Sequence, residues 1–171
     1  MRHCGNDRGA FAIPGILKLA IALAILGVLG YDTFFTIAAH LKTENNAQNA
    51  AYAASAAWTN AEGTQRSAET AFEAAVTYLQ GIEPADCASE LAASARQQPP
   101  GSVPVGCDYL CTGASNQVAL CGNHGAFTVD SDGTVHLVLR RVAKTLVFGH
   151  IGFMHGLLVA YEHGDANESQ D

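Results

Sequence analysis

The sequence predicts an α+β protein in which a long N-terminal membrane-spanning α-helix continues into a stalk and is followed by a small, disulfide-linked antiparallel β domain. Three observations predict this layout. Between Ala10 and Ala39 only two residues are charged. From residue 41 to residue 78 there is no proline, and alanine, the best helix former, dominates. Beyond residue 126, apolar and polar residues alternate on both sides of an Asp-Gly pair, which is typical of a β-hairpin.

The charge of the chain is acidic and uneven. The 171 residues have a formal net charge of −7. Residues 1–42 hold four basic and two acidic residues, whereas residues 43–171 hold five basic and fourteen acidic residues. An acidic body argues against nucleic acid as a partner, because phosphate binding needs a basic surface. The length suffices for one membrane segment and one small domain.

The two charges in the apolar run decide where the membrane segment lies. A spanning helix needs about 20 mostly apolar residues. Because a lysine near a helix end can extend its ammonium group to the lipid headgroups, we predict a transmembrane helix over 18–39 with Lys18 at the inner face. Asp32 is costly in lipid unless it is paired, which makes it a candidate contact residue. Basic residues before the run place residues 1–17, the leader and helix entry, in the cytoplasm and the C-terminal domain outside it.

Two other interpretations of the run stay open. A cleaved signal peptide needs a site of small residues, for which Thr36-Ile37-Ala38 is a candidate. A buried helix of a soluble protein would be equally apolar. Both compete with a single-pass protein held in the lipid bilayer of a bacterial cell membrane.

Residues 40–80 predict an Ala-rich helical stalk that continues the membrane helix. A break is expected at 60–63, and Thr59 with Glu62 has the form of a capping box that would restart the helix. The alanines form either a small-residue surface for close packing of partner helices or simply an exposed stalk. The side chains expected on that surface are those of Ala50, Ala53 and Ala57.

The remainder is predicted to be a loop followed by strands. Residues 81–125, which are rich in glycine and proline, form a cysteine-containing loop region. Residues 126–163 form a β-rich head whose first turn is Ser131-Asp132-Gly133. Residues 164–171 form a flexible polar tail.

Four cysteines follow the membrane run: Cys87, Cys107, Cys111 and Cys121. If the topology is right they face an oxidising compartment, where an even count in a small, loop-rich domain predicts two disulfides. Three connectivities are possible, and the sequence does not choose among them. A bond between the last two cysteines would close a short loop and stabilise the fold by about 3 kcal/mol. Zinc competes with the disulfides, because Cys107, Cys111, Cys121 and His124 are four possible ligands of the right types.

No catalytic or cofactor-binding motif is present in the sequence. It has no G-x-S-x-G, H-E-x-x-H, P-loop or dinucleotide fingerprint. His150 and His155 flank Gly152 without an accompanying carboxylate motif, and we expect ordinary surface histidines there rather than a pH sensor. We therefore expect no enzymatic activity and no cofactor.

Three segments together resemble a known family. The apolar run opens with Arg8-Gly9-Ala10-Phe11-Ala12. Near its end is Gly30-Tyr31-Asp32. The stalk contains Asn46-Ala47-Gln48-Asn49-Ala50-Ala51-Tyr52-Ala53-Ala54. In this order the segments resemble the TadE/TadG-like pseudopilin family of tight-adherence (Tad, Flp-type) pilus assembly systems. The likeness covers residues 8–58, and residues 135–160 are similar in outline. It implies a pilin-like fold, with other pilus or secretion-system membrane proteins as partners in homo- or hetero-oligomers.

One departure from the family refines the expected function. Family members that a prepilin peptidase processes carry a glutamate five residues after the glycine, and here that position is Pro14. The resemblance therefore implies an unprocessed, membrane-retained structural or assembly component of a bacterial Tad-type pilus or secretion machine, which acts by helix packing and protein–protein contacts. The alternative is an exported, membrane-anchored domain that binds a ligand or zinc.

Overall fold

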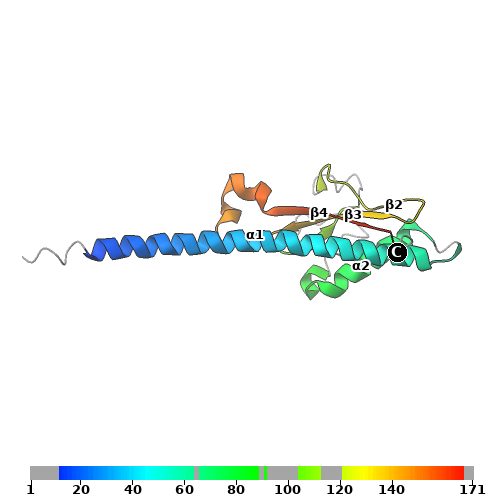
Figure 1. Ribbon diagram of the computed structural model, residues 1–171, viewed down its shortest axis with the longest axis horizontal. Coiled ribbons are helices and arrows are strands. Elements are labelled where there is room, and N and C mark those ends of the chain that lie inside the picture. Colours follow the sequence, from blue (N-terminus) through cyan, green and yellow to red (C-terminus); the bar gives the residue numbers. More distant parts are fainter. Residues whose placement is uncertain (1–11, 64–65, 89–90, 92–103, 113–120, 168–171) are drawn as a thin grey trace, which may run out of the picture.

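The computed structural model describes residues 12–63, 66–88, 91, 104–112 and 121–167. It has an α+β layout in which a long helix precedes a small antiparallel sheet, as the sequence predicted (Figure 1). The predicted leader at 1–11 lies outside the described residues. The elements are α1 (Ala12–Asn60), α2 (Ala68–Ile82), β1 (Asp108–Leu110), β2 (Thr128–Val129), β3 (Val135–Val142), the 3-10 helices η2 (Phe148–His150) and η3 (Gly152–Leu157), and β4 (Val159–Ala166).

Helix α1 has two parts with different surroundings. Its 49 residues span about 73 Å at 1.5 Å per residue. Between residues 15 and 31 no side chain is buried, whereas from Ala39 onward one side of the helix packs into the head. Within the described residues, α1 is the one helix that is long and apolar enough to cross a membrane. The predicted continuation of the apolar run into the stalk and the break after Asn60 are both confirmed.

The predicted capping box at the start of the second helix is wrong. Thr59 still belongs to α1, so its backbone is helical and it is not an N-cap. The N-cap of α2 is Ser67, whose hydroxyl oxygen accepts the backbone N–H of Thr70 at 3.2 Å. The buried face of α2 consists of Ala71, Ala75, Val76 and Leu79.

Strand β3 is the centre of the sheet. It pairs antiparallel with β4 along its whole length, from Val135 opposite Ala166 to Val142 opposite Val159. The short strands β1 and β2 both pair antiparallel with β3, so they share its other edge. The predicted hairpin between β2 and β3 is confirmed, because Asp130 and Thr134 close its turn by a backbone hydrogen bond of 2.8 Å.

Two predicted segment boundaries are wrong. The region 81–125 is not all loop, because it contains β1. Strand β4 continues to Ala166, so residues 164–166 are not part of a tail, and residues 168–171 lie outside the described residues. Residues 164–166 extend β4 because they pair with β3, and Gly164 is needed there because a Cβ would overlap the backbone carbonyl of Ala47. The strand therefore lies directly against α1 at this point.

The sheet separates two cores. Val135, Leu137 and Leu139 alternate along β3 and are buried in the main core together with alanines of α1 and the buried face of α2. Val138, which points to the opposite face, packs with Tyr109, Cys111 and Cys121 in a second, smaller core. The head therefore uses both faces of its central strand.

The four cysteines form two disulfides, Cys87–Cys107 and Cys111–Cys121. This confirms the predicted disulfides and selects one of the three connectivities. The sequence separations are 20 and 10 residues. In the loop-entropy account such bonds stabilise the fold by about 3.3 and about 2.7 kcal/mol.

Candidate functional site: the junction between helix and head

Asp32 is the point at which the exposed part of α1 meets the head. Its side chain is fully buried, and its carboxylate accepts three successive backbone N–H groups. Leu146 donates at 2.7 Å, and Val147 and Phe148 each donate at 2.8 Å. We call this arrangement the Asp32 clasp. Successive backbone N–H groups form a concave site for an anion, and hydrogen bonds to an ionised group are stronger than neutral ones.

The clasp bears on the predicted membrane segment. Asp32 was predicted to contact partner helices, and that contact stays a prediction; the contact that the structure shows lies within the chain. Asp32 is the first residue of α1 that the head buries, so the predicted span of 18–39 includes two turns that the head partly covers. Lys18 lies on the exposed part of the helix.

A buried polar cluster forms a second attachment of α1 to the head, further along the helix. Its centre is the guanidinium group of Arg141 on β3. The Nε atom of Arg141 donates to Asp108 on β1 at 2.6 Å, and a terminal nitrogen donates to Glu83, just after α2. Burial alone would lower the pKa of Arg141, but the two carboxylates outweigh it and raise that pKa above its usual range. Arg141 therefore stays charged.

Helix α1 contributes three side chains to the same cluster. Asn46 donates to Asp108 at 2.6 Å and to Glu83 at 3.3 Å. Thr43 donates to Asp108 at 3.1 Å, and Lys42 pairs with Glu83 at 3.0 Å. The two positive charges of Lys42 and Arg141 match the two negative charges of Asp108 and Glu83. We call these six residues the polar cluster; it joins α1, the end of α2, β1 and β3.

The disulfide Cys87–Cys107 reinforces the polar cluster. Glu83 precedes Cys87 by four residues, and Asp108 directly follows Cys107. The covalent bond therefore ties together the two chain segments that supply the carboxylates. Sequence reasoning missed the polar cluster, because its members are spread from residue 42 to residue 141 in no motif.

The alanines of the stalk pack mainly inside the head and not on the external surface that was predicted for Ala50. Ala50 was expected on a surface for partner helices, but it is fully buried in the main core together with Ala47, Ala51 and Ala54. Ala53 and Ala57 are half-buried. The prediction of an external surface is therefore wrong for Ala50. Small side chains allow α1 to approach β4 and α2 closely within the same chain.

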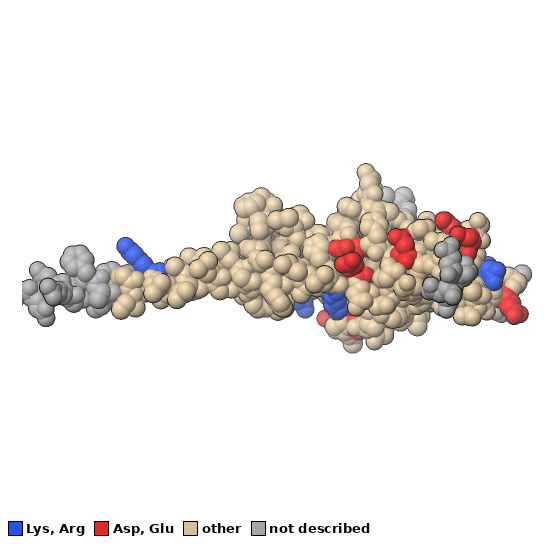
Figure 2. All heavy atoms as spheres, viewed as in Figure 1, with Lys and Arg blue, Asp and Glu red and all other residues tan. Residues whose placement is uncertain are grey.

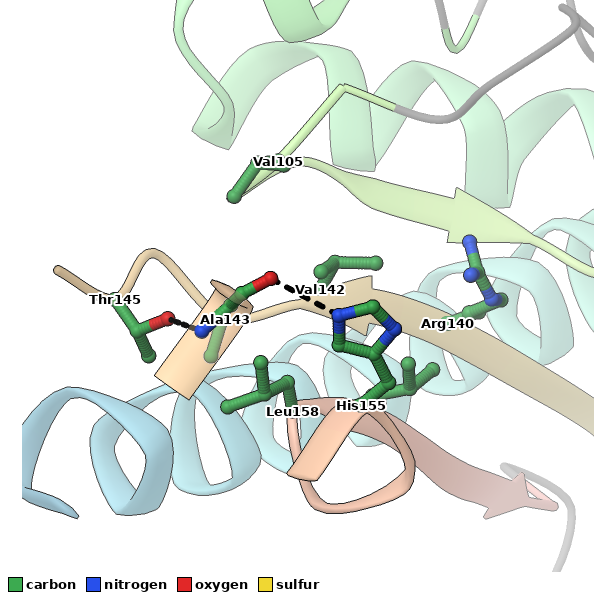
Figure 3. A pocket seen from close by; sticks show the side chains of 9 residues that line it. Val105, Arg140, Val142, Ala143, Thr145, His155 and Leu158 are labelled. Atoms are coloured by element: carbon green, nitrogen blue, oxygen red, sulfur yellow. Dashed lines mark hydrogen bonds between the residues drawn. The ribbon is translucent and has the colours of Figure 1, made fainter. Parts of the chain in front are cut away.

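Residues 143–158, which we call the β3–β4 connection, supply the N–H groups of the clasp. Two hydrogen bonds shape the connection: Gly149 N–H donates to the Thr145 hydroxyl at 3.0 Å, and His155 Nε2 donates to the Gly149 carbonyl at 2.9 Å. An open hollow of about 380 Å³ lies between the connection and the sheet, and His155 is among the side chains that line it (Figure 3). Arg140 lies at one end of the hollow, and its walls are mainly apolar. Both histidines are exposed, and His155 also forms a hydrogen bond within its own segment.

The zinc alternative conflicts with the disulfides. Cys107, Cys111 and Cys121 are all oxidised and have no thiolate to offer a metal. The fourth candidate ligand, His124, stacks on Tyr161 with ring centroids 3.8 Å apart. Within the described part of the chain, no group of three or more His, Cys, Asp or Glu side chains is arranged to hold a metal ion.

Comparison with known proteins identifies no relative. No family model, no curated protein and no solved structure matches the chain. The likeness to TadE/TadG-like proteins and the expected lack of enzymatic activity therefore stay predictions from the residues. What the geometry itself provides is a helix of membrane-crossing length that is joined to a disulfide-linked head at two buried polar sites.

Proposed function

We propose that this chain is a single-pass, membrane-anchored structural component of a bacterial Tad-type pilus or secretion machine, with a pseudopilin-like layout. The observation that carries the proposal is the continuity of α1. One unbroken helix has an exposed apolar N-terminal part and a C-terminal part packed on an antiparallel sheet. This layout agrees with the pilin-like fold that the sequence resemblance implies.

The clasp revises the proposed membrane segment. A helix inside a bilayer is surrounded by lipid, so we end its span just before Asp32, the first residue of α1 that the head buries. Residues 12–31 provide twenty helical residues, or about 30 Å, which equals the hydrocarbon thickness of a typical bilayer. Lys18 then lies about one and a half turns inside the inner end, where its long side chain reaches the headgroups. The N-terminus is cytoplasmic, and the disulfide-bonded head is outside, in an oxidising compartment.

The proposed partner surface lies on the side of α1 that the head leaves open. Phe34, Leu41 and Tyr52 are all exposed. Their spacings of seven and eleven residues place them within about 20° of one another around an ideal helix. A line of large apolar side chains that continues a membrane helix suits packing against a helix of another envelope protein. This line replaces Ala50 as the proposed contact with other pilus or secretion-system proteins.

The proposal is tested in the source bacterium. We expect deletion of the gene to abolish surface filaments or secretion, and the wild-type gene to restore them. Leu41→Gln should restore less and should weaken co-isolation of partner proteins from solubilised membranes, whereas the exposed control Glu62→Gln should behave as wild type. Normal filaments and secretion in the deletion strain would contradict the proposal.

The alternative, an exported domain that binds zinc, predicts a different purified protein. If the full chain carries stoichiometric zinc and free thiols at Cys107, Cys111 and Cys121, the alternative is correct. If its mass is lower by four hydrogens than the reduced chain and no zinc is bound, the two disulfides are formed and the alternative fails.

A further inference from the structure

The β3–β4 connection exposes more apolar side chains than folding of the chain explains. Phe153 is 84% exposed, Leu157 is 61% exposed and Leu146 is 58% exposed. They lie close together in sequence, in a segment that is hydrogen-bonded to Asp32 and, through Thr145 and His155, to itself. Large apolar side chains gathered on one exposed segment indicate a contact surface.

This surface lies beside the membrane part of α1. The clasp fixes Leu146, Val147 and Phe148 at the level of Asp32. Val147 also shares an apolar hollow with Ala24, Ile25, Val28 and Leu29. In Figure 1 the connection (orange) stands beside α1 at the end of the head that faces the N-terminus. Its apolar side chains are therefore continuous with the exposed apolar surface of the helix.

The charge around the connection suits a membrane surface. No acidic residue occurs between Asp132 and Glu162, although residues 43–171 as a whole are strongly acidic. Lys144 is exposed at the start of the connection. In the view of Figure 2 the acidic side chains gather over the far part of the head, away from the membrane helix. Anionic lipid headgroups attract a lysine and repel carboxylates, so this arrangement turns the acid-free end of the head toward the bilayer.

We propose that the β3–β4 connection is a membrane-contact element that inserts Phe153, Leu157 and Leu146 into the headgroup region of the leaflet where α1 emerges. Lys144 lies at the level of the lipid phosphates. The inference rests on the proposed membrane anchoring and adds a second contact with the bilayer. Lipid is the occupant because the connection continues the lipid-facing surface of α1 and lies where the span ends. Through the clasp, this contact fixes the tilt and rotation of the head above the membrane.

The test uses the full chain in vesicles of anionic and zwitterionic lipids whose acyl chains carry bromine, which quenches nearby tryptophan. The native Trp58 also emits, but it lies 26 residues beyond Asp32, or about 39 Å along the helix. At that distance the bromine does not quench it, so its emission is a constant background. Phe153→Trp and Leu146→Trp report on the connection. Leu23→Trp reports on the membrane helix, and Tyr52→Trp is an exposed control far from the bilayer. All four positions are exposed, so the variants should fold.

The proposal predicts that the tryptophans at 153 and 146 lose roughly half of their emission, as expected for groups at the headgroup–acyl boundary, while the tryptophan at 52 loses none. If positions 153 and 146 are quenched no more than position 52 while position 23 is quenched, the membrane contact is refuted and the anchor stands. If position 23 is not quenched either, the membrane anchoring itself fails, and this inference fails with it.

Discussion

The Asp32 clasp and the polar cluster both join α1 to the head, but the clasp sets one side chain against three backbone groups, whereas the cluster balances four charged side chains. The clasp therefore depends on a single residue and on the shape of the β3–β4 connection. The cluster is shared among four elements, yet each buried charge in it needs its partners. We therefore expect the clasp to control the position of the head relative to the exposed part of α1, and the cluster to control whether the head folds.

The largest effect is expected at the centre of the polar cluster. Arg141→Met removes the cation that pairs with Asp108 and Glu83. The two buried carboxylates are then left with too little positive charge and too few hydrogen-bond donors beside them. We expect a loss of about 3–5 kcal/mol in the free energy of unfolding, measured by denaturant unfolding of the full chain in detergent. The neighbouring Arg140→Met, at a half-buried position, is the matched control and should cost far less. Equal losses for the two variants would refute the central role of Arg141.

The second effect separates the two disulfides. Replacing Cys87 and Cys107 by alanine opens the larger loop and frees the segments that carry Glu83 and Asp108. The loop-entropy account gives a loss of about 3.3 kcal/mol for this pair and about 2.7 kcal/mol for Cys111 and Cys121. Because the polar cluster depends on the first bond alone, we expect the first pair of replacements to be the more destabilising. The difference between the two losses in unfolding free energy should be larger than the difference between these two values. If removal of the Cys111–Cys121 bond destabilises the fold more than removal of the Cys87–Cys107 bond, the proposed support of the polar cluster by the latter bond is refuted.

A smaller effect on unfolding is expected at the clasp. Asp32→Asn places an amide NH₂ group against N–H donors and removes the charge that strengthens the three hydrogen bonds. The loss in stability should be smaller than for Arg141→Met, because the main core and the cluster remain intact. Asp132→Asn is a suitable control, since that carboxylate accepts its hydrogen bond from the backbone N–H of Thr134 in an exposed turn. If unfolding shows no difference between the two variants, the clasp contributes nothing to the junction.

The smallest effect is a dependence of stability on pH at His136, an incompletely buried histidine on the central strand β3. The hydrogen bond to Asp165, at 2.6 Å, raises the pKa of His136, and Asp130 at 3.4 Å adds to it. The folded state therefore binds this proton more tightly than the unfolded state. The stabilisation is complete below the usual histidine pKa of about 6.5 and is lost as pH rises through the raised value. Because the pair is exposed, we expect wild type to lose about 0.5 kcal/mol relative to His136→Gln between these limits. A difference that stays constant across this pH range would contradict the assignment.

Local patterns in the sequence predicted α1, its end near Asn60 and the β2–β3 hairpin, because helix propensity and turn chemistry depend on neighbouring residues. Strand β1 was missed, since Asp108-Tyr109-Leu110 is too short to show alternation. The end of β4 was missed because His163-Gly164-Asp165 has the composition of a polar tail. Its order comes from pairing with β3 and from the contact of Gly164 with α1, more than a hundred residues away in sequence.

The candidate site was predicted only in part, again because its contacts join residues that are far apart in the sequence. An acidic residue in an apolar run marked Asp32 as a contact, but its partners are backbone N–H groups, which have no sequence signature. The apolar surface of the β3–β4 connection had one available signal, the absence of acidic residues between Asp132 and Glu162. Only the fold brings that surface beside the exposed apolar part of α1.

Hydrogen exchange at the clasp tests the junction between membrane helix and head most directly. The full chain is placed in lipid bilayers, and exchange of the backbone amides of Leu146, Val147 and Phe148 is measured in wild type and in Asp32→Asn. The account predicts strong protection in wild type, a large loss of protection in the variant and unchanged protection in β3. Amides at 146–148 that exchange at the rate of an open loop in wild type would contradict it.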